Sequence, residues 1–253
     1  MQRFYRIDHR GTPRFVVESG RTWQLVEGDL FGEWQAGDVV NSSGQRLLAP
    51  VNPSKIVAIG RNYKDHAAEL NNPLPVEPLI FLKPPSSIVG PGAPIVLPSG
   101  VGRVDHEAEV GVVVGRLARH VKRADASKYV FGFTCVNDVT ARELQKKDVQ
   151  FTRAKGFDTF APIGPSLVTG LDYQGSEGLL VEGYVNGERR QSSSTKSLIF
   201  PIDELIEFVS AVMTLLPGDI ISTGTPAGVG PLKAGDSVTI KVAGVGELTN
   251  PVQ

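Results

Sequence analysis

The chain has 253 residues and a mass of 27.1 kDa, a length that allows one large domain or a main domain with a small appendage. Its 26 lysines and arginines nearly balance 27 aspartates and glutamates, which argues against binding to nucleic acids or anionic membranes, since such proteins usually carry a basic excess. A single cysteine, Cys135, excludes an internal disulfide and a cysteine-based zinc site.

Residues 1–52 are predicted to form a small N-terminal β domain. RFYRID, RFVVES and TWQLVEGDL are typical of short strands, and a turn-rich stretch follows as far as RLLAPV. Pro50 and Pro53 flank the predicted boundary. The opening MQRFYRIDHRG lacks the apolar core of a signal peptide, and no apolar run approaches the roughly 18 residues of a membrane span. We therefore expect a soluble, cytoplasmic protein.

Residues 53–253 are predicted to mix strands with short helices. KIVAIG, LIFLK, residues 103–116, YVFGFTCVNDV, DIISTG and SVTIKVAGVGEL favour strands, and LLVEGYVNGERR favours a hairpin with Asn186-Gly187 at its tip. RNYKDHAAEL and TARELQKKD favour short helices, whereas IDELIEFVSAVMTL predicts a longer amphipathic helix that Pro217-Gly218 would end. These elements do not alternate as strand–helix units, so we expect an α+β, β-rich fold.

Acidic residues cluster on one predicted strand, in the segment VDHEAEVGVVV. Glu107 and Glu109 would share one face about 6.7 Å apart, while His106 would point to the other face as a structural histidine. Asp138 ends an apolar strand and needs a partner if it is buried. Alternatively, these acidic residues could simply lie on the solvent-exposed face of an antiparallel strand. Three carboxylates without a nearby metal-facing histidine or cysteine nevertheless suit a hard ion, Mg²⁺ or Mn²⁺.

Polar residues that follow this cluster along the chain could complete a site. Arg142 and Gln145 would face the metal if a helix starts just after Asp138. Lys155 would hold a substrate carboxylate or stabilise an enolate if the chain returns it to the metal, and would otherwise be a solvated charge.

A second pair of residues has the spacing of a catalytic dyad. His66 and Glu69 lie three apart in a predicted helix, so the carboxylate could orient the imidazole as a general base. The alternative is a surface histidine–glutamate pair. Residues 60–63, directly after a buried strand, lie where active-site loops often begin.

The glycine-rich segment 224–230 is not a phosphate loop, because it lacks the Gly-Lys-Ser/Thr ending and precedes a strand. It favours a backbone-rich cradle for a carboxylate, with the Thr225 hydroxyl donating. Cys135 lies within an apolar strand and is predicted to be a buried filler residue.

Taken together, the ordered motifs from about Pro53 onward resemble those of the fumarylacetoacetate hydrolase family. They are IGRNYKDHAAE, FLKPPSSIVGPG, DHEAEVGVVVG, VNDVTARELQ, AKGFDTFAPIGP, MTLLPGDIISTGTPAGVGPL and ELTNPV. The resemblance implies a β-roll-like fold of mixed sheets, a homodimer, and one Mg²⁺ or Mn²⁺ per chain. The first 50 residues resemble the small extra domain of the bacterial homoprotocatechuate-pathway branch.

The same resemblance implies a role for each matching position. Glu107, Glu109 and Asp138 match metal ligands, and His66, Glu69 and Lys155 match catalytic residues. Gln145 and Thr225 match substrate-contact positions, for which Arg61, Tyr63, Lys83 and Arg142 are weaker candidates.

The resemblance also implies a small-molecule substrate with a 2-oxo or 2-enol carboxylate, processed through an enolate. A 2-hydroxyhepta-2,4-diene-1,7-dioate isomerase or the linked decarboxylase is the favoured activity. An acylpyruvate or fumarylpyruvate hydrolase and an oxaloacetate decarboxylase or tautomerase are the alternatives. An alternative outside the enzymes is a non-catalytic β domain that binds an acid or a sugar. That function would give Lys155 no role.

Overall fold

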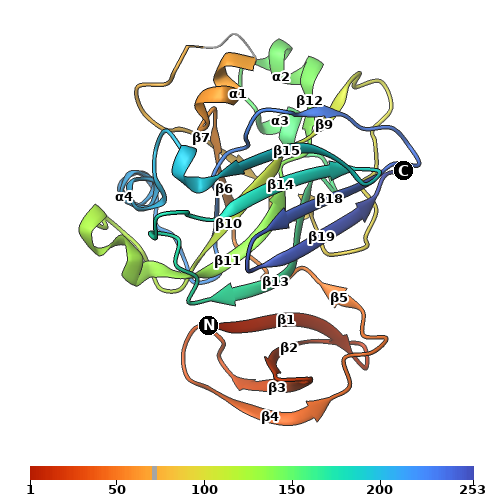
Figure 1. Ribbon diagram of the computed structural model, residues 1–253, viewed down its shortest axis with the longest axis vertical. Helices are drawn as coiled ribbons and strands as arrows, with labels where there is room; N and C mark the ends of the chain where they lie inside the picture. The colour runs from red at the N-terminus through yellow and green to blue at the C-terminus, as the bar shows by residue number, and fades with distance from the viewer. Residues whose placement is uncertain (70–72) are drawn as a thin grey trace.

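The molecule is β-rich, with two facing sheets and few helices, which confirms the expected α+β class (Figure 1). The computed structural model describes residues 1–69 and 73–253. The strands are β1 (Gln2–His9), β2 (Thr12–Ser19), β3 (Thr22–Gly28), β4 (Trp34–Val40), β5 (Leu47–Leu48), β6 (Ile56–Gly60), β7 (Leu79–Lys83), β8 (Ile88–Val89), β9 (Val104–His106), β10 (Ala108–Val114), β11 (Val130–Asn137), β12 (Thr140–Ala141), β13 (Ala161–Thr169), β14 (Leu180–Val185), β15 (Glu188–Ser194), β16 (Ile220–Ser222), β17 (Gly230–Pro231), β18 (Ser237–Val242) and β19 (Gly246–Pro251). The helices are α1 (Lys64–Glu69), α2 (Arg142–Asp148), α3 (Thr152–Lys155) and α4 (Ile202–Val212), with 3₁₀ turns η1 (Pro85–Ser87), η2 (Arg123–Tyr129) and η3 (Thr195–Ser197).

A large mixed sheet forms the centre of the fold. Its strand order is β4-β3-β2-β1-β13-β11-β10-β16-β6-β7, and β16–β6 and β13–β8 are its parallel pairs. A second sheet, β15-β14-β18-β19, packs against it through apolar side chains such as Val112 of β10, Val181 of β14 and Ile240 of β18. This two-layer packing buries the even-numbered face of β10 and leaves the face that carries Glu109 to other neighbours.

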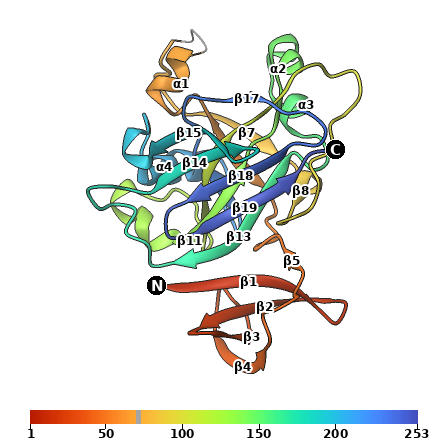
Figure 2. The same cartoon turned by 45° about the vertical axis from the view of Figure 1, so that its right-hand side comes forward.

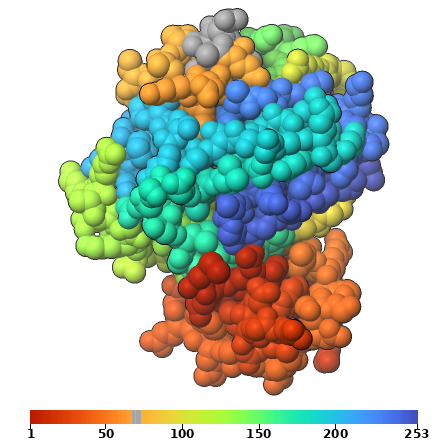
Figure 3. All heavy atoms as spheres, viewed as in Figure 1, coloured from red at the N-terminus to blue at the C-terminus, as the bar shows by residue number. Residues whose placement is uncertain are grey.

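The N-terminal strands continue the central sheet, because β1 pairs with β13 in antiparallel register. In the figures they form a lobe at one end of the molecule (Figures 1 and 3). Phe4 and Val26 of this lobe share an apolar cluster with Val113 of β10 and Val136 of β11. The lobe is therefore fixed to the main sheet by both backbone pairing and buried side chains.

Three local predictions differ from the structure. The amphipathic helix ends at Val212 and not at Pro217, because Leu215 instead exchanges backbone hydrogen bonds with Ala118. Strand β4 was expected to be turn-rich, since Gly37 and Asp38 interrupt its pattern. Helix α3 was not expected at all, because a single helical turn carries too little periodicity to detect.

Helices α1, α2 and α3 gather at the end of the molecule that lies opposite the N-terminal lobe (Figures 1 and 2). The hairpin expected around Asn186-Gly187 is confirmed by β14 and β15, with positive φ at both turn residues. Within the described part of the chain, no helix is long and apolar enough to cross a bilayer.

Candidate active site

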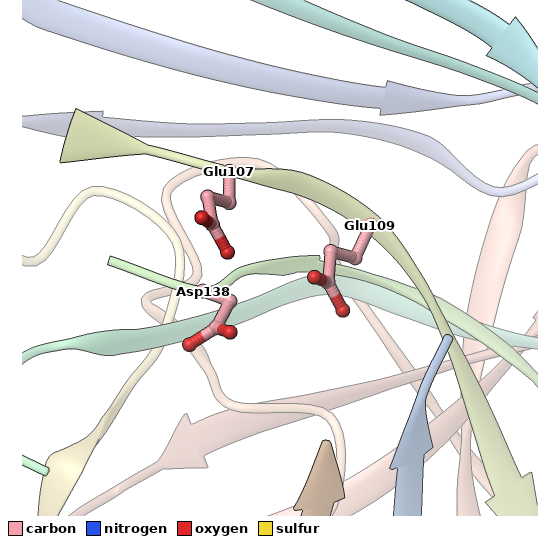
Figure 4. Close-up of side chains that lie close together, drawn as sticks. All are labelled: Glu107, Glu109 and Asp138. Atoms are coloured by element: carbon pink, nitrogen blue, oxygen red, sulfur yellow. The ribbon is translucent and has the colours of Figure 1, made fainter. Parts of the chain in front are cut away.

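Three buried carboxylates converge where β10 begins and β11 ends. Glu107 lies between β9 and β10, Glu109 follows on β10, and Asp138 comes directly after β11 (Figure 4). One oxygen of each lies within 4.8 Å of the others. The Asp138 N–H donates to the Glu107 carbonyl at 2.9 Å, and the Glu107 N–H donates to the Asn137 side chain at 3.0 Å. The sheet register thus fixes the three carboxylates relative to one another.

Three buried or nearly buried cations neutralise part of this charge. The Lys155 ammonium contacts Asp138 and lies 2.7 Å from Glu107, and the Arg142 guanidinium also lies 2.7 Å from Glu107. Lys83, which is fully buried, contacts Asp138 at 2.5 Å and donates to the carbonyl of Lys155 at 2.6 Å. Buried carboxylates need such partners, because their desolvation would otherwise be prohibitive.

Glu109 differs from the other two carboxylates. It accepts hydrogen bonds from the Ser222 hydroxyl and the Gly224 N–H, and it forms no ion pair with any described residue. Burial, together with the charges of Asp138 and Glu107, raises the pKa of Glu109 to about 8. Burial also acts to raise the pKa of Glu107, but Lys155 and Arg142 outweigh it and hold that pKa far below its usual range.

This arrangement fits a divalent cation. The cluster still lacks positive charge at Glu109, whose high pKa is the signature of that deficit. The donor set is three carboxylates, with no cysteine sulfur or histidine nitrogen, and hard ions such as Mg²⁺ or Mn²⁺ prefer oxygen ligands. His106 is directed elsewhere, since its Nδ1 lies 3.1 Å from the Gln191 side-chain oxygen.

A cavity of about 910 Å³ opens above the carboxylates. Its lining is made by residues of β6, β7, β10, the three short helices and the loop after β16, namely Ile59, Gly60, Arg61, His66, Leu79, Ile80, Phe81, Leu82, Glu107, Glu109, Arg142, Gln145, Lys146, Val149, Gln150, Phe151, Thr152, Lys155 and Thr225. The cavity is large enough for a substrate of drug-like size or smaller.

His66 of the predicted dyad lines this cavity, and Glu69 stands behind it. His66 is buried, and its Nδ1 lies 3.1 Å from the Glu69 carboxylate. The other Glu69 oxygen accepts a hydrogen bond of 3.0 Å from the Gly228 N–H. A Cβ at Gly228 would stand 2.0 Å from the carbonyl oxygen of Arg190 on β15, so this close approach of the loop to the strand requires glycine.

The remaining predicted substrate residues divide into two groups. Arg61, Gln145 and Thr225 line the cavity, and the Gln145 side chain accepts a hydrogen bond from Arg142 at 3.0 Å. Lys83 and Tyr63 are fully buried and are not part of the cavity lining among the described residues. Lys83 therefore acts on the cavity indirectly, through its contacts with Asp138 and with the carbonyl of Lys155.

Segment 224–230 does cradle carboxylates through its backbone, as expected, but they are the protein's own. Gly224 donates to Glu109, and Gly228 donates to Glu69. The Thr225 hydroxyl donates to the Ala108 carbonyl at 3.0 Å and so holds the loop against β10. The loop thereby connects the acidic cluster to the dyad.

Several supporting residues gave no usable sequence signal. Ser222 ends a short apolar strand, and Gln191 is a buried polar residue within an otherwise exposed strand. Gln191 accepts from the Ala108 N–H and donates to Thr225 and the Pro226 carbonyl. Asn62, also fully buried, bridges the segment before α1 to Phe200 and Thr223. Such contacts connect positions far apart in sequence, which no local pattern encodes.

Cys135 is fully buried, and its pKa is raised to about 12 by that burial. A thiol in this state is a packing group and not a nucleophile, as the sequence indicated.

Comparison with known proteins places these features in context. Residues 55–253 match the fumarylacetoacetate (FAA) hydrolase C-terminal family, and residues 2–50 match the Rv2993c-like N-terminal family. The mitochondrial oxaloacetate tautomerase of Xenopus laevis is 43% identical over 224 residues, which span 85% of this chain and 70% of the relative.

Two solved structures illustrate the range of similar proteins. The 2-hydroxyhepta-2,4-diene-1,7-dioate isomerase of Mycobacterium marinum superimposes with a TM-score of 0.91 at 42% identity, over 100% of this chain and 98% of that one. The maleylpyruvate hydrolase of Sphingobium sp. SYK-6, solved with manganese and pyruvate, gives a TM-score of 0.82 at 32% identity, over 99% and 98% of the two chains.

Proposed function

This chain belongs to the fumarylacetoacetate hydrolase family, and we propose that it is a divalent-metal-dependent enzyme that acts on 2-oxo or 2-hydroxy-enoic dicarboxylates through an enolate. The activity we favour is that of a 2-hydroxyhepta-2,4-diene-1,7-dioate isomerase or its linked decarboxylase. The observation that carries this proposal is the buried carboxylate cluster, of which Glu107 and Glu109 line a cavity that is also lined by His66, the partner of Glu69.

Glu107, Glu109 and Asp138 would hold the ion. A bound Mg²⁺ or Mn²⁺ supplies Lewis-acid polarisation of a 2-oxo carboxylate, which favours removal of a proton from the carbon chain.

The protein's own groups would manage the charge and the proton. Lys155 is buried beside Asp138 and Glu107, whose charges raise its pKa despite its burial, so it stays cationic and can stabilise negative charge on the substrate. Glu69 engages Nδ1 of His66, which leaves Nε2 as the ring nitrogen that can accept or return a proton within the cavity. Phe81 and Phe151 of the lining help to exclude water from this exchange.

Two alternative activities have specific support. The complete His66–Glu69 pair could activate water for carbon–carbon hydrolysis, and the similar maleylpyruvate hydrolase binds manganese and pyruvate. The similar oxaloacetate tautomerase favours enol–keto interconversion of a shorter diacid. All three activities would use the same carboxylate cluster and the same His66, so the cavity beyond the carboxylates would determine which one prevails.

We also propose a homodimer, which light scattering of the purified protein would test.

The test is a proton NMR time course in D₂O with protein stripped by a chelator and then supplied with Mg²⁺, Mn²⁺ or no metal. The substrates are 2-hydroxyhepta-2,4-diene-1,7-dioate, acetylpyruvate and oxaloacetate. We expect metal-dependent conversion of the seven-carbon diacid to its 2-oxo isomer. We also expect metal-dependent deuterium exchange at C3 of acetylpyruvate, faster than in a control without protein and without cleavage.

Other outcomes would replace the favoured activity. Metal-dependent release of acetate and pyruvate from acetylpyruvate would make the protein a hydrolase. Faster turnover of oxaloacetate than of the longer diacid would favour the tautomerase or decarboxylase. Equal activity with and without metal would contradict the metal-dependent mechanism itself.

A further inference from the structure

The cavity has a charged inner end and an apolar, more exposed outer end. Glu107 and Glu109 at the inner end are 4% and 1% exposed. Toward the opening, Leu79 and Leu82 are 39% and 42% exposed, and Val149 is 81% exposed. A ligand held at the carboxylates would therefore extend past an aliphatic wall before it reaches solvent.

Helix α2 places one cation at that outer end. Arg142, Gln145 and Lys146 are three and four residues apart, so they share one helix face, and all three line the cavity. Arg142 is buried against Glu107, whereas Lys146 is exposed and lies about 6 Å farther along the helix axis. The neighbouring Lys147 is also exposed, but it is not part of the lining among the described residues.

The Lys146 ammonium has no interaction partner within the described part of the chain. It has no ion-pair or hydrogen-bond partner there, whereas Arg153 on the next helix pairs with Asp148 in a fork of two hydrogen bonds. The only carboxylates in the described lining of the cavity are Glu107 and Glu109 at its inner end. A positive charge at the end of an apolar wall, with no protein partner, suits an anionic group on the ligand.

We propose that Lys146 binds the distal carboxylate of the substrate and so selects dicarboxylates of about six or seven carbons. This inference rests on the proposed function, because it takes the first carboxylate and the 2-oxygen to lie at the inner end. From C2 to the distal carboxyl carbon, a seven-carbon diacid spans about 6 Å when extended, which matches the offset between Arg142 and Lys146. A four-carbon diacid spans only about 2.5 Å over the same part and would leave Lys146 unoccupied.

The experiment measures binding to manganese-loaded protein by isothermal titration calorimetry. The probes are 2-oxoheptanedioate and 2-oxoheptanoate, which share chain length and differ only in the distal carboxylate. Four proteins are compared: wild type, Lys146→Gln, Lys146→Arg and the matched control Lys147→Gln, which removes the same charge one residue away. Turnover and manganese affinity are measured on the same preparations.

We expect wild type to prefer the diacid by about tenfold, the size of one charge-assisted hydrogen bond at a partly exposed rim. Lys146→Gln should abolish this preference while it leaves binding of the monoacid and of manganese within about twofold. Lys146→Arg should retain the preference, and Lys147→Gln should leave it unchanged. The preference of wild type should also shrink as salt is added, because the contact lies at the rim.

Two results would overturn the inference. One is an unchanged preference for the diacid over the monoacid in Lys146→Gln. The other is an equal loss of that preference in Lys147→Gln, which would indicate a general electrostatic attraction and not a direct contact. If either result is found while the protein still turns over the seven-carbon diacid, the role of Lys146 is refuted and the proposed function is not. A Lys146-dependent preference without turnover of that diacid contradicts the proposed function alone.

Discussion

The two ends of one face of β10 have different surroundings, and this difference gives them different roles. Glu109 and Val113 lie on the same face of β10, about 13 Å apart. Val113 is covered by the N-terminal lobe, through a cluster that includes Phe4 and Val26. Glu109 instead faces a cavity and is held by Ser222 and Gly224. The chemistry of each end therefore follows from what covers it, and the lobe stabilises a sheet whose active end it does not line.

The largest expected effect comes from the acidic end. Glu107→Ala should reduce kcat/KM by at least about 1000-fold, because it removes a proposed metal ligand and the partner of two cations. Glu107→Gln, which keeps the volume, should lose manganese affinity by at least about 100-fold while it remains folded by circular dichroism. Steady-state kinetics measures the first loss, and calorimetry with manganese measures the second. Glu143→Ala, an exposed carboxylate on α2, is the control, and full metal-free activity of the Glu107 variants would refute the assignment.

At the covered end, Phe4→Ala should lower the free energy of unfolding by about 3–5 kcal/mol, because it leaves a cavity in the shared apolar cluster. Urea unfolding measures the loss. The KM of the folded variant should remain at the wild-type value, since the lobe contributes no residue to the cavity lining among the described residues. Val39→Ala, 66% exposed on the same lobe, should change stability by less than about 0.5 kcal/mol. A raised KM in Phe4→Ala would show that the two ends are coupled.

The stability of the protein should depend on pH through the acidic end of β10, because Glu109 titrates there and the apolar end has no comparable group among the described residues. Burial raises the pKa of Glu109 from 4.5 to about 8, so its contribution to stability is full below pH 4.5 and is lost as the pH rises from there to 8. Metal-free wild type should therefore lose on the order of 1–3 kcal/mol between pH 5 and pH 8. Glu109→Gln should flatten that loss, because the amide does not titrate. Parallel urea curves for both proteins across this range would contradict the raised pKa.

The smallest expected effect lies at the rim of the cavity. Val149 has a φ of 64° and forms a γ-turn in which the Gln150 N–H donates to the Asp148 carbonyl at 2.6 Å. A β-branched residue is strained there, so Val149→Gly should raise the free energy of unfolding by about 1 kcal/mol after the entropic cost of glycine. Val212→Gly, an exposed valine in an ordinary helical turn, should instead lower it by about 0.5–1 kcal/mol. Thermal unfolding would distinguish the two signs.

Local sequence patterns were sufficient for most elements. The alternation around Glu109 predicted β10, and Asn186-Gly187 predicted the hairpin of β14 and β15, because both signals depend only on neighbouring residues. The same patterns placed the helix of residues 202–216 too long, since its apolar period continues after the backbone of Leu215 has paired with Ala118.

The sequence by itself determined which residues carry charge at the ends of apolar strands, and hence the acidic trio that the resemblance names as metal ligands. Only the tertiary structure decided how Lys83, Lys155 and Arg142 are distributed among those carboxylates. It also decided that Glu109, alone among the three carboxylates, has no cationic partner among the described residues, and that Gly228 holds Glu69 beside His66. The physical reason is that charge pairing and burial are set by residues distant in sequence, whereas strand alternation is set by adjacent ones.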